Sequence, residues 1–230
     1  MHVVELRGPA KNALGTEMMR WLRQQLDEAA GEPLLLTGSD GAFSAGLNLA
    51  ELYECDTDGI VAFLDVLIDL TEAMLRYPGP LVTYVNGHAI AGGCVLAICG
   101  DHRVVADDDR ARIGLNEVAL GLRFPPPLLR LVRSCIDPRT ERQVILGAGL
   151  HRPADAVRLG MVDEVGDLGT AKARLEALAT NPRQAYADTK VDLRRAVFQA
   201  HPTEAAIADD VLRSWTSDAL RARLAAFLKR

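Results

Sequence analysis

The chain has 230 residues, of which 49% are apolar and 25% charged, and its net charge at neutral pH is −5. This composition is ordinary for a globular enzyme, and the length allows one or two domains around a substantial core. The negative charge argues against nucleic acid as the main partner, and no apolar run is long enough to cross a membrane. Because no signal peptide is visible at the N-terminus, we expect a cytoplasmic protein.

The first third of the chain predicts a strand, a helix and a second strand. Residues 2–6 alternate as a strand does, and a helix is expected at Glu17–Ala30 with Thr16 as its N-cap. Leu34–Gly38 is apolar throughout, which is typical of a strand that is buried on both faces of a parallel sheet. The apolar face predicted for the helix comprises Met18, Trp21, Leu22, Leu26 and Ala29.

A loop of small residues follows at positions 39–49, after the carboxyl end of the second strand. Open α/β sheets bind ligands at this edge. Residues 51–58 are polar and irregular, residues 59–76 predict an amphipathic helix, and residues 81–85 predict another strand. That strand leads into the turn at Asn86-Gly87, so strand, loop and helix recur.

The stretch from Asn86 to Gly121 holds the strongest chemical signals. An apolar run at 94–99 predicts a short buried helix that begins after Ala91-Gly92-Gly93. Glycines at a helix start let backbone N–H groups approach a ligand oxygen closely, at the positive end of the helix dipole. Glu117 lies among apolar residues, where the pKa of a carboxyl rises toward the range that suits a general base. We expect Asp101, which follows the short helix, to be structural.

Helices dominate the remainder of the chain. They are expected at 128–135, at 137–146, just after residue 152, at 168–178 and at 191–229, with a break at His201-Pro202; residues 161–165 are strand-like. The fold class is therefore α/β. We divide the chain into a βα-repeat core at 1–165 and a helical part at 166–230.

Two segments resemble the oxyanion-hole loops of the crotonase (enoyl-CoA hydratase/isomerase) superfamily. Residues 41–49, GAFSAGLNL, resemble the first loop, and residues 86–94, NGHAIAGGC, resemble the second. Asn12-Ala13-Leu14 and Gly100-Asp101 also fit, and the similarity extends over nearly the whole chain. The resemblance implies a crotonase-like ββα-spiral core with a helical C-terminal trimerisation region, and acyl-CoA thioesters as substrates.

The resemblance also assigns roles to individual residues. The backbone N–H groups of Leu47 and Gly92 would hold the thioester oxygen, and Glu117 would be the base. Hydratases of the family carry a second glutamate where this chain has Val95. The single carboxylate favours proton relocation over hydration, and the chain looks most like the Δ3,Δ2-enoyl-CoA isomerases.

Further implications concern the nucleotide and the assembly. No metal and no cofactor are expected beyond coenzyme A as part of the substrate. The partner would be another copy of the chain in a homotrimer or a dimer of trimers, with neither nucleic acid nor membrane involved. The residues that the resemblance places against CoA are Ala10, Lys11, Ala45, Asn48, Phe227 and Arg230. For the last two, an ordinary helix end is an equally good interpretation.

Other functions stay open at this point. One class is another crotonase-type reaction on an acyl thioester, such as hydration, hydrolysis or decarboxylation, with the acyl group on CoA or on a carrier protein. A different class is a non-catalytic protein that binds acyl-CoA or assembles with an active relative. Glu117 favours catalysis, because a silent scaffold has no need for a carboxylate among apolar residues.

Overall fold

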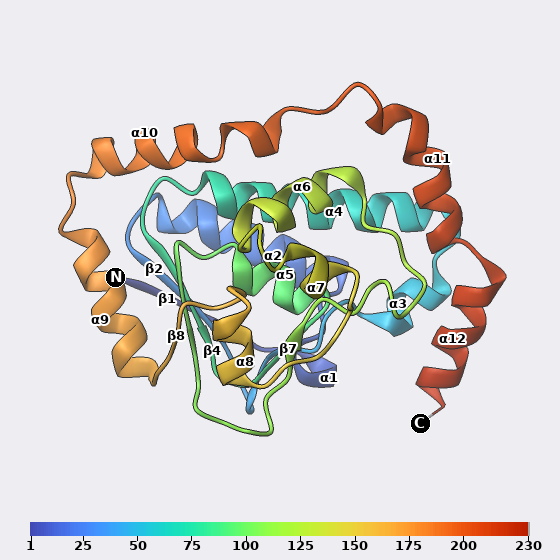
Figure 1. Cartoon of the computed structure of the whole chain (residues 1–230), viewed down its shortest axis with the longest axis horizontal. Coiled ribbons are helices and arrows are strands. Elements are labelled where there is room, and N and C mark those ends of the chain that lie inside the picture. Colours follow the sequence, from blue (N-terminus) through green and yellow to red (C-terminus); the bar gives the residue numbers. More distant parts are fainter. Residues whose placement is uncertain (230) are drawn as a thin grey trace.

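The computed structural model describes residues 1–229, and two parallel sheets form its centre (Figure 1). The larger sheet has the strand order β1-β2-β4-β6-β8, and all its strand pairs are parallel. Its inner strands are almost wholly buried, because helices cover both faces, which explains their apolar sequences. The strand bounds are β1 His2–Leu6, β2 Leu34–Gly38, β4 Leu81–Val85, β6 His102–Val105 and β8 Glu164–Val165.

A second, three-stranded parallel sheet has the order β3-β5-β7. Its strands are Ala42–Ser44, His88–Ile90 and Ile113–Gly114. The first two lie inside the glycine-rich loops, and the third precedes Glu117 by a few residues. This small sheet therefore brings together three segments that are far apart in the sequence.

The helices α2 (Thr16–Ala29) and α4 (Thr57–Arg76) pack against one another beside the sheets. The buried face of α2 includes Met19, with 0% of its surface exposed, whereas Trp21 is 36% exposed. The prediction was therefore wrong for Trp21, whereas Met18 is half-buried and packs against the core, as expected. Thr16 is also not the N-cap: Gly15 takes that position.

The other helices enclose the core and then wrap around it. In Figure 1, α9 lies at one side, α10 runs across the top and α11 and α12 descend the opposite side. Residues 51–58, expected to be irregular, contain most of a short helix, α3. No helix within residues 1–229 combines the length and apolar character needed to span a membrane. The bounds are α1 Pro9–Asn12, α3 Leu49–Glu54, α5 Gly92–Ile98, α6 Pro126–Cys135, α7 Glu141–Ile145, α8 Pro153–Arg158, α9 Leu168–Ala179, α10 Arg183–Leu193, the 3₁₀ helix Arg195–Phe198, α11 Glu204–Trp215 and α12 Asp218–Leu228.

A buried ionic cluster attaches α10 to the core. Asp101 accepts hydrogen bonds from Lys190 Nζ (2.7 Å), Arg194 (2.8 Å), the hydroxyl of Tyr186 (2.8 Å) and the backbone N–H of Leu81 (2.9 Å). Lys190 also donates to the carbonyl of Gly79. Burial lowers the pKa of Lys190 to about 8, against the opposing effect of the Asp101 charge. The structural role expected for Asp101 agrees with this geometry.

The turn at Ala10–Asn12 is left-handed at three successive residues. Their φ values are 49°, 58° and 59°, a region that residues other than glycine avoid. Asn12, which is 1% exposed, holds the turn: its Nδ2 donates to the carbonyls of Ser39 (3.2 Å) and Ala42 (3.0 Å), and its Oδ1 accepts from the N–H of Gly8 (3.0 Å).

Replacing Asn12 by alanine should therefore destabilise the protein. Several buried partners would lose their hydrogen bonds at once, and each such loss costs about 1–3 kcal/mol. We expect the free energy of unfolding to fall by about 3 kcal/mol or more. Denaturant titration would measure this. Asn181→Ala, at an exposed position, is the matched control and should change little.

Candidate active site

The two glycine-rich loops meet at Gly46, Leu47 and Gly92. The carbonyl of Ile90 lies so close to Gly46 that a Cβ there would be 2.7 Å from it, and Gly46 has a φ of +99°. The side chain of Leu47 packs over Gly92, where an added Cβ would be 2.6 Å from Leu47 Cδ2. Glycine is therefore required at position 46, for close approach to the backbone and for its φ, whereas a side chain at position 92 would have to displace the side chain of Leu47.

Two backbone N–H groups remain available at this junction. Leu14 and Leu47 form a parallel bridge, in which the N–H of Leu14 donates to the carbonyl of Gly46 and the N–H of Asn48 donates to that of Leu14. The N–H of Leu47 consequently points away from Leu14. Gly92 is the first residue of α5, so its N–H has no acceptor within the helix. Neither N–H donates to another group within residues 1–229.

Ala91 sets the orientation of the Gly92 peptide. Its φ of 48° and ψ of −122° are unfavourable for a residue with a Cβ, a strain that costs about 1–3 kcal/mol. Hydrogen bonds fix it on both sides: its N–H donates to the carbonyl of Gly114 (2.8 Å), and its own carbonyl accepts from the N–H of Val95 (2.9 Å). The start of α5 is thus tied to β7.

Glu117 follows β7 and is 6% exposed. Its Oε2 is buried and has no hydrogen-bond partner within residues 1–229. Burial raises the pKa of Glu117 to about 7, although its own backbone N–H opposes the shift. The carboxylate lies close enough to Cys94 in α5 to raise the pKa of that thiol, after burial itself. A buried, unpaired carboxyl of this kind can accept and release a proton near neutral pH.

Val95 lies one residue beyond Cys94 and is 1% exposed. Cys94 and Val95, adjacent residues of α5, are both buried, and neither carries a carboxylate. The site has one carboxylate, two free N–H donors and no positive charge held against Glu117 by the described residues.

The residues predicted to contact CoA fall into two groups. Ala10 and Lys11 are exposed on the left-handed turn, and the N–H of Ala45 donates to the carbonyl of Lys11 (3.0 Å), so these three lie together. Asn48 is instead occupied as the N-cap of α3, where its side chain accepts from the N–H groups of Ala50 and Glu51.

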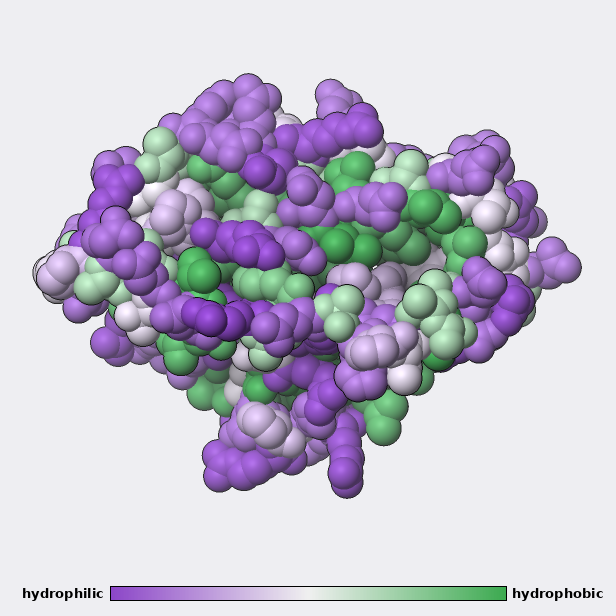
Figure 2. Space-filling view, turned by 90° about the horizontal axis from the view of Figure 1, so that it is seen from above, coloured by the Kyte–Doolittle hydropathy of each residue, from purple (hydrophilic) through white to green (hydrophobic). Residues whose placement is uncertain are grey.

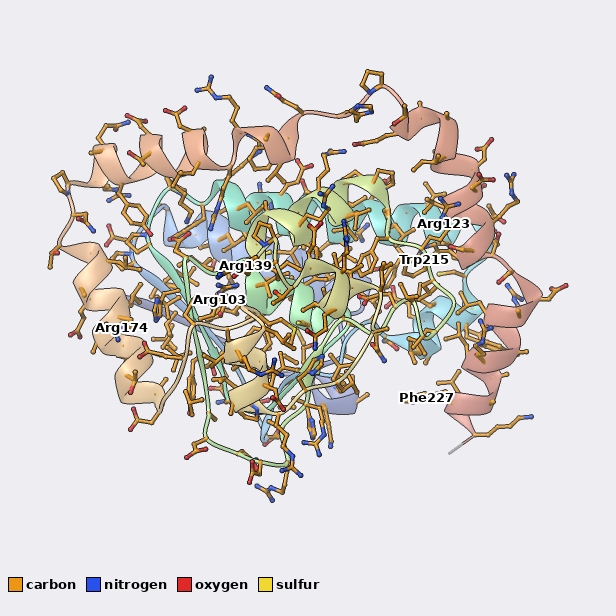
Figure 3. The ribbon with its side chains drawn as sticks, in the orientation of Figure 1. Arg103, Arg123, Arg139, Arg174, Trp215 and Phe227 are labelled. Carbon is orange, nitrogen blue, oxygen red and sulfur yellow. The ribbon has the colours of Figure 1, made fainter. Side chains whose placement is uncertain are left out.

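The other two residues predicted to contact CoA, Phe227 and Arg230, belong to the C-terminal end of the chain, far along the sequence from the turn at Ala10–Asn12. Phe227 is 61% exposed near the end of α12, which lies at the far side of α3 from the sheets (Figures 1 and 3). Arg230 lies outside the described residues. Their proposed contact with the nucleotide stays a prediction.

The family model described as "Enoyl-CoA hydratase/isomerase" matches residues 1–230, the whole chain. The chain belongs to this family.

Individual members of the enoyl-CoA hydratase/isomerase family give a finer comparison. The mouse mitochondrial enoyl-CoA delta isomerase 1 is 34% identical over 169 residues, which are 71% of this chain and 58% of that protein. The crotonyl-CoA hydratase of Syntrophomonas wolfei is 30% identical, over 69% of this chain and 62% of that protein. The match thus spans less than two thirds of either relative.

The fold agrees with that of solved family members. The crystal structure of human mitochondrial delta3-delta2-enoyl-CoA isomerase superposes with a TM-score of 0.85 at 26% identity, covering 99% of this chain and 92% of that one. The prediction of a crotonase-like α/β fold is confirmed. The resemblance to the enoyl-CoA hydratase/isomerase family, drawn from the two loops, is likewise confirmed.

Some structural features of this family member could not be predicted from sequence alone. The strained backbone of Ala91 could not be predicted, because alanine is not a residue type that is typical of a positive φ. Glu51 was assigned to an irregular segment, yet its carboxylate accepts from both the N–H and the hydroxyl of Thr16 and so satisfies the start of α2. The proximity of a carboxylate to Gly15-Thr16 becomes visible only when α3 is placed beside α2.

Proposed function

We propose that this chain is a Δ3,Δ2-enoyl-CoA isomerase. Glu117 takes a proton from C2 of a 3-enoyl thioester, and the electron pair of that C–H bond moves into a dienolate. The N–H groups of Leu47 and Gly92 stabilise the negative charge on the thioester oxygen; losing one such donor typically costs about 3–4 kcal/mol. Glu117 then returns the proton to C4, which leaves the double bond between C2 and C3.

The observation that carries this proposal is the lone carboxylate. A base that both removes and returns a proton must have both forms accessible, and the pKa of Glu117, raised to about 7, allows this near neutrality. Hydration calls for a water to be activated and positioned, for which two carboxylates serve best. Val95 occupies the position where the resemblance places the second one. Enoyl-CoA hydration is the second candidate, and the similarity to the S. wolfei hydratase favours it.

A direct assay separates the two. Purified protein is given 3-hexenoyl-CoA or crotonyl-CoA, and conversion is followed by absorbance of the conjugated thioester. We expect turnover of 3-hexenoyl-CoA to exceed hydration of crotonyl-CoA by about 100-fold, the lower range of a general-base contribution. Comparable rates would assign the chain to the hydratases, and binding of both thioesters without turnover would assign it to the non-catalytic members.

The remaining parts of the proposal concern the assembly. Coenzyme A is needed only as part of the substrate, with no metal or further cofactor. We propose a homotrimer or a dimer of trimers, supported by apolar side chains that stay exposed on the helical part, including Leu193 (81% exposed), Val191 and Phe227. Figure 2, the view onto the face that carries α10, shows patches of hydrophobic residues between hydrophilic ones across the middle of this face. The cytoplasmic location and the boundary at residue 165 stay predictions from the sequence.

A further inference from the structure

Residues 117–124, which begin with the proposed base Glu117, form an irregular segment between β7 and α6. The carbonyl of Glu117 accepts hydrogen bonds from the N–H groups of Leu120 (3.0 Å) and Leu122 (2.9 Å), so the segment folds back on the peptide of Glu117 itself. Leu122 is 7% exposed. A displacement of residues 120–124 would therefore move Glu117.

Helices α11 and α12 hold this segment from outside. The indole Nε1–H of Trp215 donates to the carbonyl of Arg123 (2.9 Å), and the N–H of Arg123 donates to the hydroxyl of Ser214 (3.2 Å). Both polar groups of one residue's backbone are thus satisfied by α11. Figure 3 shows the labelled Arg123 and Trp215 next to one another beside this helix.

A second contact lies at the middle of the segment. The guanidinium of Arg223 in α12 donates to the carbonyl of Leu120 (3.0 Å) and lies over Gly121, whose φ is +77°. A side chain at Gly121 would be strained by that φ and would meet Arg223, so the glycine is needed for the turn and for this contact.

The helices that provide these contacts are themselves fixed. Trp215 is 4% exposed and belongs to the main hydrophobic core, and the other buried side chains of the two helices belong to the same core. These are Val211, Leu220 and Leu224. The hydrogen bonds to residues 120–123 therefore come from helices that are anchored in the core by their own buried side chains.

We infer that α11 and α12 form a brace that positions Glu117 for proton transfer, with Trp215 and Arg223 as its positioning residues. Neither residue touches the reacting atoms; each acts through the backbone of residues 117–124. This inference rests on the proposed function, since it assigns Glu117 the role of base.

Trp215 also lines a cavity, which offers an alternative role for it in binding the acyl chain. It borders a cavity of about 200 Å³ between α3–α4 and α11–α12, together with Leu52, Ile60 and Leu220. If Trp215 served mainly as a wall for the acyl chain, its replacement would change substrate binding. A positioning role instead changes the chemical step, so the two roles are separable in KM and kcat.

The test is Trp215→Phe, which keeps the aromatic ring and removes the Nε1–H donor. We expect kcat for 3-hexenoyl-CoA to fall about 10-fold or more, because misplacing a catalytic group by about 1 Å costs on the order of 100-fold. KM should stay within about 2-fold. The matched control is Trp21→Phe, the same change at the chain's other tryptophan, on α2, and it should leave both constants unchanged.

The titration of Glu117 provides a readout without substrate. The carboxyl signal, identified by its loss in Glu117→Gln, is followed against pH by carbon NMR in the wild type and in Trp215→Phe. A loosened segment admits water, so the apparent pKa should move from about 7 toward the ordinary value near 4.5. Arg223→Met should act in the same direction, and Arg223→Lys, which keeps a donor, should restore part of kcat.

The outcomes are distinct. Wild-type kcat and an unshifted titration in both Trp215→Phe and Arg223→Met would overturn the brace, even with a lowered melting temperature. A change confined to KM would overturn it in favour of the acyl wall. Should Trp215→Phe fail to fold, Arg223→Met decides, because Arg223 is exposed. A wild type inactive on 3-hexenoyl-CoA would refute the proposed function alone, since the shifted titration would still support the brace.

Discussion

Glu117→Gln should lose isomerase turnover while it keeps most of its affinity for CoA thioesters. The amide preserves the size of the side chain but cannot accept the C2 proton. General-base catalysis contributes about 10²–10⁴-fold, and the same group serves both proton transfers here, so the loss in kcat should lie at the upper end of that range or beyond. Binding should survive because the groups proposed to hold the thioester oxygen belong to the backbone.

The pH profile should show the same carboxyl. Because the ionised form is the base, kcat/KM of the wild type should rise with pH through about 7, the pKa to which burial raises Glu117, and the variant should lack this limb. Rate measurements between pH 5 and 9 would test it. Wild-type turnover in Glu117→Gln would remove Glu117 as the base and, with it, the proposed single-carboxylate mechanism.

The substitution should also stabilise the protein above neutral pH. A carboxyl whose folded pKa exceeds its unfolded value of 4.5 contributes stability while it is protonated, and that contribution is lost as pH rises from about 4.5 through about 7. The shift from 4.5 to about 7 corresponds to about 3.5 kcal/mol at most, at about 1.4 kcal/mol per pKa unit. Glu117→Gln should therefore melt higher than the wild type at pH 8, and the two should converge at pH 5.

Asp101→Ala should be the most destabilising of the substitutions considered. It removes one carboxylate and leaves the buried Lys190 and the partly buried Arg194 without an anion, a situation that costs about 3–5 kcal/mol. The N–H of Leu81 and the hydroxyl of Tyr186 lose their acceptor as well. The melting temperature should drop by about 10 °C for a chain of this size, which calorimetry would measure.

A control for Asp101→Ala is available on the surface. Asp108 pairs with Arg110 in the loop before β7, where solvent screens the pair, so Asp108→Ala should leave stability nearly unchanged. Equal melting temperatures for the two variants would show that the hydrogen bonds and ion pairs of Asp101 add no net stability to the folded protein. Folded Asp101→Ala protein should retain kcat, because the cluster does not contact Glu117 within the described residues.

The parts of this fold that could be predicted from sequence are those with a local pattern. The apolar strands at 34–38 and 81–85 and the buried helix after Gly92 each have a hydrophobic run of ordinary length. Glu117 stood out because a carboxylate interrupts apolar sequence. The strands β3, β5 and β7 have only three, three and two residues, too few for a period to show, so the small sheet that joins the loops was not predicted.

Contacts between segments that are distant along the chain could not be predicted because neither partner carries a local signal of the other. Nothing near Asp101 indicates that its cations lie 89 and 93 residues away, and nothing near Arg123 indicates an indole in α11. The full burial of Met19 beside the half-buried Met18 is a smaller case. The rotation of α2 about its axis decides how deeply each of the two adjacent methionines is buried, and the packing of α2 against α4 and β1 sets that rotation.

The distance along the chain between Arg123 and Trp215 has a consequence for biosynthesis. The two residues are separated by 92 positions, and a ribosome adding about 5–20 residues per second takes about 5–20 s to cover that interval. During this time the backbone of Arg123 and the carbonyl of Leu120 lack the partners that they have in the folded protein. The hydrogen bonds that α11 and α12 make to residues 120–123 can therefore form only after both helices have been synthesised, long after Glu117 has been added to the chain.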